Sequence, residues 1–289
     1  MSLKLQKRLV TLFIAAAVVL ANAVALVCIP QHCASAQTIY YLDDSKDYSG
    51  GGVSYEDSEY IYRDSYTVND TYFVEFAPSY GNGDTSKTNF CAATAGTNIV
   101  GYYDRFYTNL MPNFEPGMMI NGVYCYYPDV GFSAVTTVFN TLYDMMDINV
   151  GGIGTTGTGF KNGLQSYVQG QGYSLSYTSF YANSKNVNLT AFGNAINAGK
   201  VGVLLCTSYN FVYAIVHSDG QTFVSKANST NAHIMMVYGY ITINYYNNGS
   251  LFRTDTYLQA SSGFGSGEQG YIKMDDDLDI EEALIVNIS

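Results

Sequence analysis

Apolar side chains recur at helical intervals in the middle of the chain. Within residues 89–110, apolar residues from Ala95 to Phe106 return every three or four positions and so share one face. Pro112 and Pro116 follow and are expected to end that helix. The same spacing predicts further helices over residues 133–146, 159–169 and 190–198.

Strand patterns lie mainly in the last third of the chain. Apolar runs there are short, rich in β-branched and aromatic residues, and bounded by turn residues, which is typical of strands. They cover residues 201–206, 211–216, 233–243, 254–261, 270–274 and 283–288, and weaker alternation occurs at 60–66 and 71–76. Because helices come first and strands second, the pattern predicts the α+β class with segregated halves.

The N-terminus has the features of an export signal over residues 1–36. Three basic residues precede an apolar run from Leu9 to Leu20, and Ala34-Ser35-Ala36 is an A-x-A cleavage site. The competing interpretation is an uncleaved membrane anchor, in which case the protein would stay attached to the membrane. We expect a secreted or cell-surface protein with an N-terminal extension or propeptide at 37–80 and one domain at 81–289.

The composition argues against a nucleic-acid-binding function. The chain has 24 acidic and 13 basic residues, a net charge of −11, and no cluster of Lys and Arg, so a nucleic-acid partner is not expected. Removing residues 1–36, which hold three basic and no acidic residues, would leave 253 residues with a net charge of −14. Three cysteines (Cys91, Cys125, Cys206) and two histidines (His217, His233) would remain, so at least one thiol is free.

Cys91 and His233 are the candidate chemical groups. Cys91 stands in the first turn of a predicted helix, where free N–H groups and the helix dipole favour a thiolate. A thiolate nucleophile needs an imidazole to form the ion pair and to protonate the leaving group. His233 opens an apolar strand that would hold the ring rigidly, whereas His217 precedes a turn signal, Ser218-Asp219-Gly220.

These residues lie in short motifs that resemble the papain-like clan of cysteine peptidases, and within it the bacterial C39-like and streptopain-like branches. The motifs follow the family's order between about residues 80 and 275. They are Asn89-Phe90-Cys91-Ala92-Ala93-Thr94-Ala95, Ile196-Asn197-Ala198-Gly199-Lys200, Ala232-His233 through Tyr240, and Gly263-Phe264-Gly265 before Gly270-Tyr271-Ile272. The resemblance implies a papain-like fold, with a helical N-terminal half carrying the cysteine and an antiparallel β half carrying the histidine.

The resemblance also implies roles for the matching residues. Cys91 corresponds to the nucleophile and His233 to the general acid/base of peptide-bond hydrolysis. Where the clan has an orienting Asn or Asp, this chain offers Ser261 or Ser262, whose hydroxyl could accept from the imidazole. The usual oxyanion Gln is replaced by Thr85, so Asn82 or Asn89 could supply the amide.

The sequence leaves several alternatives open. Cys125 and Cys206 could form a disulfide or could both be buried thiols. No metal or other cofactor is expected, because no cysteine or histidine pair has close ligand spacing, and the chain is expected to be a monomer acting on peptides or proteins. A Cys/His hydrolase of cell-wall peptides and a non-catalytic binding module are the competing functions, the second favoured by serine at the orienting position.

Overall fold

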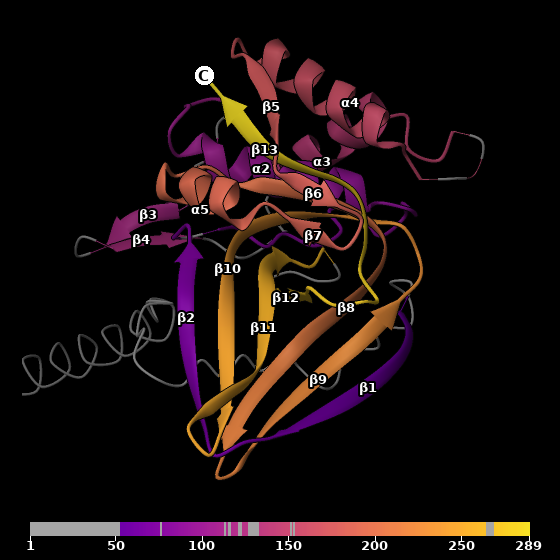
Figure 1. Cartoon of the computed structure of the whole chain (residues 1–289). Coiled ribbons are helices and arrows are strands. Elements are labelled where there is room, and N and C mark those ends of the chain that lie inside the picture. Colours follow the sequence, from indigo (N-terminus) through magenta and orange to yellow (C-terminus); the bar gives the residue numbers. More distant parts are fainter. Residues whose placement is uncertain are drawn as a thin grey trace, which may run out of the picture.

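The computed structural model describes residues 53–75, 77–112, 114, 117–120, 123–126, 133–150, 152, 154–263 and 269–289. The predicted signal peptide, Phe264 and Gly265 lie outside these residues. One antiparallel sheet of nine strands dominates the described part, and helices pack against one end of it (Figure 1). No helix within these ranges is long and apolar enough to span a membrane.

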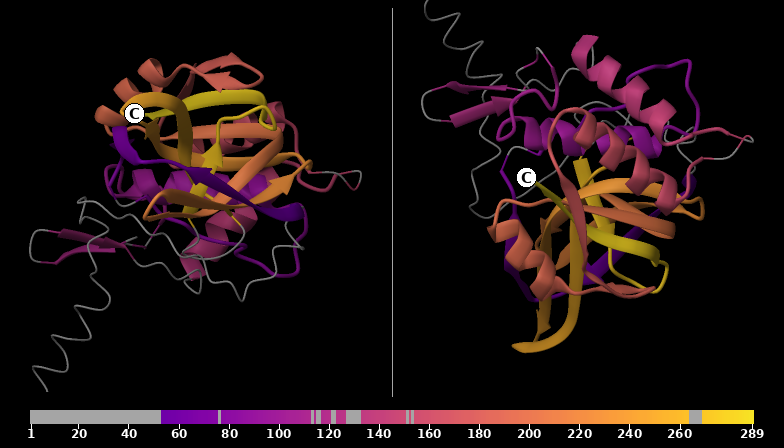
Figure 2. Two further views of the ribbon diagram at one scale, coloured as in Figure 1. Left: turned by 60° about the horizontal axis from the view of Figure 1, so that its bottom comes forward. Right: turned by 90° about the horizontal axis from the view of Figure 1, so that it is seen from above.

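The large sheet has the strand order β1-β9-β8-β12-β11-β10-β2, and β13 pairs with both β5 and β8. Its longest strand, β8, pairs with β10 and β13 near its start and with β9 towards its end, so the sheet curves strongly (Figure 2). The strands are β1 (Val53–Tyr62), β2 (Ser65–Phe73), β5 (Leu175–Ser179), β8 (Gly202–Ser218), β9 (Gln221–Ser229), β10 (His233–Asn247), β11 (Ser250–Ser261), β12 (Gln269–Lys273) and β13 (Asp279–Ile288).

Four helices and two small hairpins complete the described structure. The helices are α2 (Cys91–Asp104), α3 (Ser133–Met145), α4 (Gly157–Gly170) and α5 (Leu189–Asn197). The hairpins are β3 (Gly117–Ile120) with β4 (Val123–Tyr126), and β6 (Tyr181–Asn183) with β7 (Asn186–Val187). Every residue of α2 after Cys91 is buried, because α2 packs between β10, α3 and α4.

The apolar interior forms two clusters. The larger one joins the helices to the sheet and includes Ile99 of α2, Phe139 of α3 and Met236 of β10. The smaller one lies among β1, β2 and the distal parts of β8 to β12, around Ile61 and Tyr245. We refer to the part of the sheet around this smaller cluster as the distal sheet.

The expected papain-like α+β fold with a helical N-terminal half is wrong. Two long strands, β1 and β2, precede the first described helix, and strands β3 to β7 lie between the helices. The 201–206 and 211–216 runs form one 17-residue strand, and β9 has no counterpart in the apolar pattern because its buried positions include Thr222, Ser225 and Asn228. The result is a mostly antiparallel β structure without segregated halves.

Residues 53–75 are an integral part of the sheet. Strand β1 pairs with β9 and strand β2 pairs with β10 (Figure 1). Ile61 is buried in the smaller apolar cluster. Both strands lie within the 37–80 segment, for which the sequence left open a packed extension or a propeptide.

Candidate active site

Cys91 and His233 meet where helix α2 crosses the first residues of strand β10. Cys91 is the first residue of α2, and His233 is the first residue of β10. The thiol and the imidazole are hydrogen-bonded to each other. His233 is buried, and Cys91 is half-buried.

The two groups shift each other's pKa in opposite directions. Burial raises the pKa of Cys91, but the hydrogen bond and charge of His233, with the N–H groups of Ile234 and Ala92, lower it below its ordinary value. Burial lowers the pKa of His233, but the bond to Cys91, its charge and the Ser262 carbonyl raise it above its ordinary value. Both shifts favour the thiolate–imidazolium pair over the neutral thiol and imidazole.

A main-chain carbonyl orients the imidazole. The Nε2 atom of His233 lies 2.9 Å from the carbonyl oxygen of Ser262. Because a carbonyl only accepts, Nε2 carries a proton, and Nδ1 is the ring nitrogen left for Cys91. Tyr209 of β8 stacks on the ring, with centroids 5.7 Å apart and an interplanar angle of 19°.

The two serines that were predicted to orient the imidazole make different contacts. Ser262 contacts His233 through its main chain, whereas the Ser261 hydroxyl donates to the Pro78 carbonyl at 2.6 Å. This second bond ties the end of β11 to the loop before α2. Both serines are buried.

The loop that carries Asn82 is fixed to α2, the helix that begins with Cys91. Asn98 of α2 accepts from the Tyr80 N–H at 2.6 Å and donates to the Tyr80 carbonyl at 3.3 Å. Asn82 Oδ1 accepts from the Asp84 N–H at 3.0 Å, so the carbonyl end of this side chain closes a turn. Asn89 is exposed, and its side-chain amide donates to Asn149 Oδ1.

Cys206 lies beside the pair in the next strand. It is opposite His233 in the β8–β10 register, and its sulfur is 3.9 Å from the His233 carbonyl oxygen. It is a free, buried cysteine, so no disulfide joins it to Cys125. Burial raises its pKa, and the charge of Cys91 adds to that shift, which keeps Cys206 a neutral thiol.

Acidic side chains elsewhere in the described ranges serve to join elements of the fold. Within the described ranges, no three His, Cys, Asp or Glu side chains are arranged to hold a metal ion. In the acidic turn after β12, Asp275 and Asp277 accept from the Asn210 amide at 3.0 and 2.8 Å. These carboxylates join that turn to strand β8.

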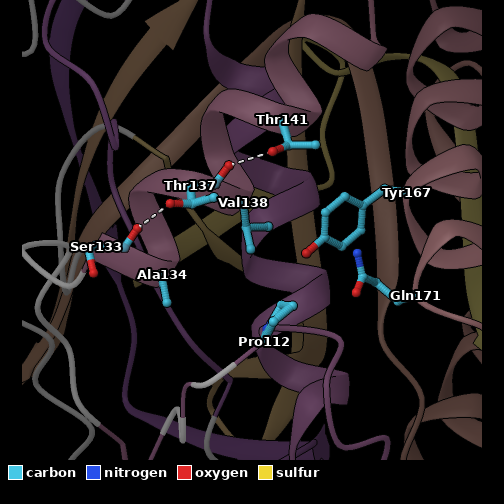
Figure 3. Close-up of a pocket in the computed structure, with 8 residues that line it drawn as sticks. All are labelled: Pro112, Ser133, Ala134, Thr137, Val138, Thr141, Tyr167 and Gln171. Carbon is cyan, nitrogen blue, oxygen red and sulfur yellow. Dashed lines mark hydrogen bonds between the residues drawn. The ribbon is translucent and has the colours of Figure 1, made fainter.

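A separate pocket of about 410 Å³ lies between α3 and α4 (Figure 3). Its lining contains neither Cys91 nor His233. The Thr137 and Thr141 hydroxyls donate to carbonyls of their own helix, and the Tyr167 hydroxyl donates to the Leu110 carbonyl. These polar groups are already hydrogen-bonded within the protein, and we assign no chemistry to the pocket.

Sequence reasoning missed the contacts of Tyr209 with the imidazole and of Asn98 with the loop before α2. No spacing rule marks them, because each acts across elements that are far apart in the sequence.

Comparisons with protein-family models, with curated proteins and with solved structures gave no match for this chain.

Proposed function

We propose that the protein is a cysteine peptidase in which Cys91 forms an acyl-enzyme and His233 is the general acid/base. The observation that supports it most is the hydrogen-bonded Cys91–His233 pair, with its opposite pKa shifts. A thiolate paired with an imidazolium is the form that attacks an amide carbonyl. The motif resemblance supports the same assignment, and the export signal expected at 1–36 supports action outside the cytoplasm.

In the proposed first half-reaction, the amide bond of the substrate is cleaved and the acyl-enzyme forms. The Cys91 sulfur attacks the carbonyl carbon, and the carbonyl oxygen becomes an oxyanion. The Cys91 N–H at the start of α2 is one donor to this oxyanion, and the Asn82 amide is the proposed second donor. As the C–N bond breaks, imidazolium Nδ1–H of His233 protonates the leaving amine, so the acyl group stays on sulfur.

The second half-reaction regenerates the pair. Neutral Nδ1 of His233 takes a proton from water, and the water oxygen attacks the thioester carbon. The C–S bond then breaks, the acid product leaves, and Cys91 returns as a thiolate beside imidazolium. The Ser262 carbonyl holds the Nε2 proton throughout, so that Nδ1 always faces the reacting atoms.

An epoxide inhibitor of thiol peptidases tests the proposal on residues 37–289. Mass mapping is expected to find modification at Cys91, with Cys206 unmodified as an internal control because it is buried and neutral. Cys91→Ala should remove the label, and His233→Ala should slow labelling strongly.

No label on Cys91 in folded, reduced protein would contradict the peptidase proposal and favour the binding-module alternative. Digestion of casein supports a general peptidase. Release of peptide fragments from cell walls without casein digestion would instead identify the cell-wall hydrolase alternative.

A further inference from the structure

The segment that leads into α2 adopts an unusual backbone conformation. Asn89, two residues before Cys91, has a φ of 54°, and Asn149, which follows α3, has a φ of 65°. Positive φ is rare outside glycine, although Asn tolerates it better than most residues. The direction in which the chain enters α2 therefore depends on what holds Asn89 in this conformation.

Side chains from α3 and the turn after it hold this entry segment. Asn149 Oδ1 accepts from the Asn89 amide, and Asn149 Nδ2 lies 2.7 Å from Thr88 Oγ1 and 3.1 Å from the Thr88 carbonyl oxygen. The Tyr143 hydroxyl donates to that carbonyl at 2.9 Å and lies 2.6 Å from Asn149 Nδ2. Lys87 places its ammonium 4.6 Å from the centre of the Tyr143 ring.

The helix itself provides little fixation at this end. Phe90, the N-cap residue of α2, makes no side-chain cap bond, and the first turn holds no acidic residue. An Asn, Ser or Thr cap would normally fix this turn. In this chain the bonds from Asn149 and Tyr143 reach the two residues just before Phe90.

We propose that Asn149 is a positioning residue, which fixes Cys91 against His233 by holding Thr88 and Asn89. The inference rests on the proposed peptidase function and deepens it. A displacement of the nucleophile by about 1 Å can lower the rate about 100-fold. The contacts of Asn149 with the entry segment can therefore control the reactivity of Cys91 from outside the site. The side-chain hydrogen bonds of Asn149 reach Thr88, Asn89 and Tyr143, and so act on the thiol only through the entry segment.

The test measures peptide hydrolysis and the pH dependence of Cys91 alkylation for the wild type and four variants. The groups that face Cys91 are His233 of β10 and Cys206 and Tyr209 of β8. None of these is altered. Asn149→Ala should lower kcat by about 10- to 100-fold with KM unchanged within about threefold. It should also raise the pH midpoint of alkylation, because a displaced thiol loses part of its ion pair with His233.

Two further variants test whether the hydrogen bonds of the entry segment, and not the overall stability of the protein, control the reactivity of Cys91. Asn89→Gly keeps the left-handed conformation accessible but removes the amide, and Tyr143→Phe removes one hydroxyl. Both should shift kcat and the alkylation midpoint in the same direction as Asn149→Ala, by less. Asn248→Ala is the matched control, because Asn248 also has a positive φ of 50° but lies in the turn between β10 and β11. It should leave both readouts unchanged.

Wild-type kcat and an unchanged alkylation midpoint in folded Asn149→Ala would overturn the inference. If that variant does not fold, the same result in Asn89→Gly and Tyr143→Phe would overturn it. Failure of the peptidase proposal would appear in the wild type, as a Cys91 that does not react. Failure of the positioning role would appear only in the variants, and the alkylation readout needs no substrate.

Discussion

The candidate site and the distal sheet each contain one described histidine, and the two histidines differ in their partners. His233 is hydrogen-bonded to a thiol, and its pKa is raised. His217 stacks on Tyr66, with ring centroids 3.7 Å apart, and its Nδ1 lies 2.8 Å from the Thr222 hydroxyl. Burial and the nearby charge of Arg63 lower the pKa of His217 to about 4.

The comparison shows that burial alone does not make a histidine reactive. Burial disfavours the imidazolium at both positions, and only an anionic partner reverses that effect. His217 faces a guanidinium and is therefore neutral at pH 7, joining β8 to β2 in the distal sheet. At His233 burial also lowers the pKa, but the hydrogen bond and charge of Cys91, together with the Ser262 carbonyl, outweigh it, so the pKa is raised.

Replacing each histidine should give the largest contrast. His233→Ala is expected to lower kcat/KM for peptide hydrolysis by about 1,000-fold or more, because the thiolate loses its partner and the amine its proton donor. His217→Ala should stay within about twofold in kcat/KM but should unfold at lower urea concentration, because it loses the stack and the Thr222 bond. Equal losses of activity in the two variants would contradict the assignment.

A second prediction concerns the ion pairs that hold β1 in the distal sheet. Glu59 lies 2.6 Å from Arg253 and 2.7 Å from Lys273, and the Lys273 side chain is only 7% exposed. Glu59→Gln leaves Lys273 with Asp275 at 3.7 Å, so it should lower the free energy of unfolding by about 2–3 kcal/mol. Urea denaturation measures this, and Glu281→Gln, at an exposed carboxylate, should change it by less than about 0.5 kcal/mol.

The same carboxylate makes stability depend on pH. Burial raises the pKa of Glu59, but the bonds and charges of Arg253 and Lys273 lower it to about 2, below the ordinary 4.5. Its contribution is therefore present above about pH 4.5 and is lost as the pH falls through about 2. Glu59→Gln should flatten the stability curve in that window, and a curve as steep as that of the wild type would contradict this role.

The smallest expected effect comes from a test of which group of Ser262, its main-chain carbonyl or its hydroxyl, orients the His233 imidazole. Ser262→Ala keeps the carbonyl that accepts from His233, so kcat/KM should fall by less than about threefold. Ser261→Ala loses the bond to Pro78 and should cost about 1 kcal/mol of stability. A loss of more than about 30-fold in Ser262→Ala would show that its hydroxyl orients the imidazole.

The sequence predicted the local elements better than the fold. The helices expected at 133–146 and 190–198 correspond to α3 and α5, because their apolar spacing matches the buried face. The helix expected over 89–110 ends earlier, at Asp104, whose carboxylate accepts from the Met111 N–H at 2.7 Å. Strand pairing decided the fold class, and the apolar pattern does not reveal which polar segments pair.

The candidate site could be predicted from the sequence only in part. Cys91 and His233 stood out because each residue type carries chemistry at a characteristic place in its own element. The Ser262 carbonyl could not be found in this way, because every residue has a carbonyl and only the end of β11 places this one beside the ring. Asn149 was also hidden, since its role depends on how the turn after α3 packs against residues 88 and 89.

Titration of the two histidine rings by NMR, in residues 37–289 with and without Cys91→Ala, tests the central claim most directly. The ion-pair account predicts that His233 titrates above 6.5 in the wild type and falls below 6.5 in Cys91→Ala, because only the burial effect then dominates. His217 should titrate near 4 in both proteins. A His233 that titrates below 6.5 in the wild type, or that does not respond to the loss of Cys91, would contradict the account.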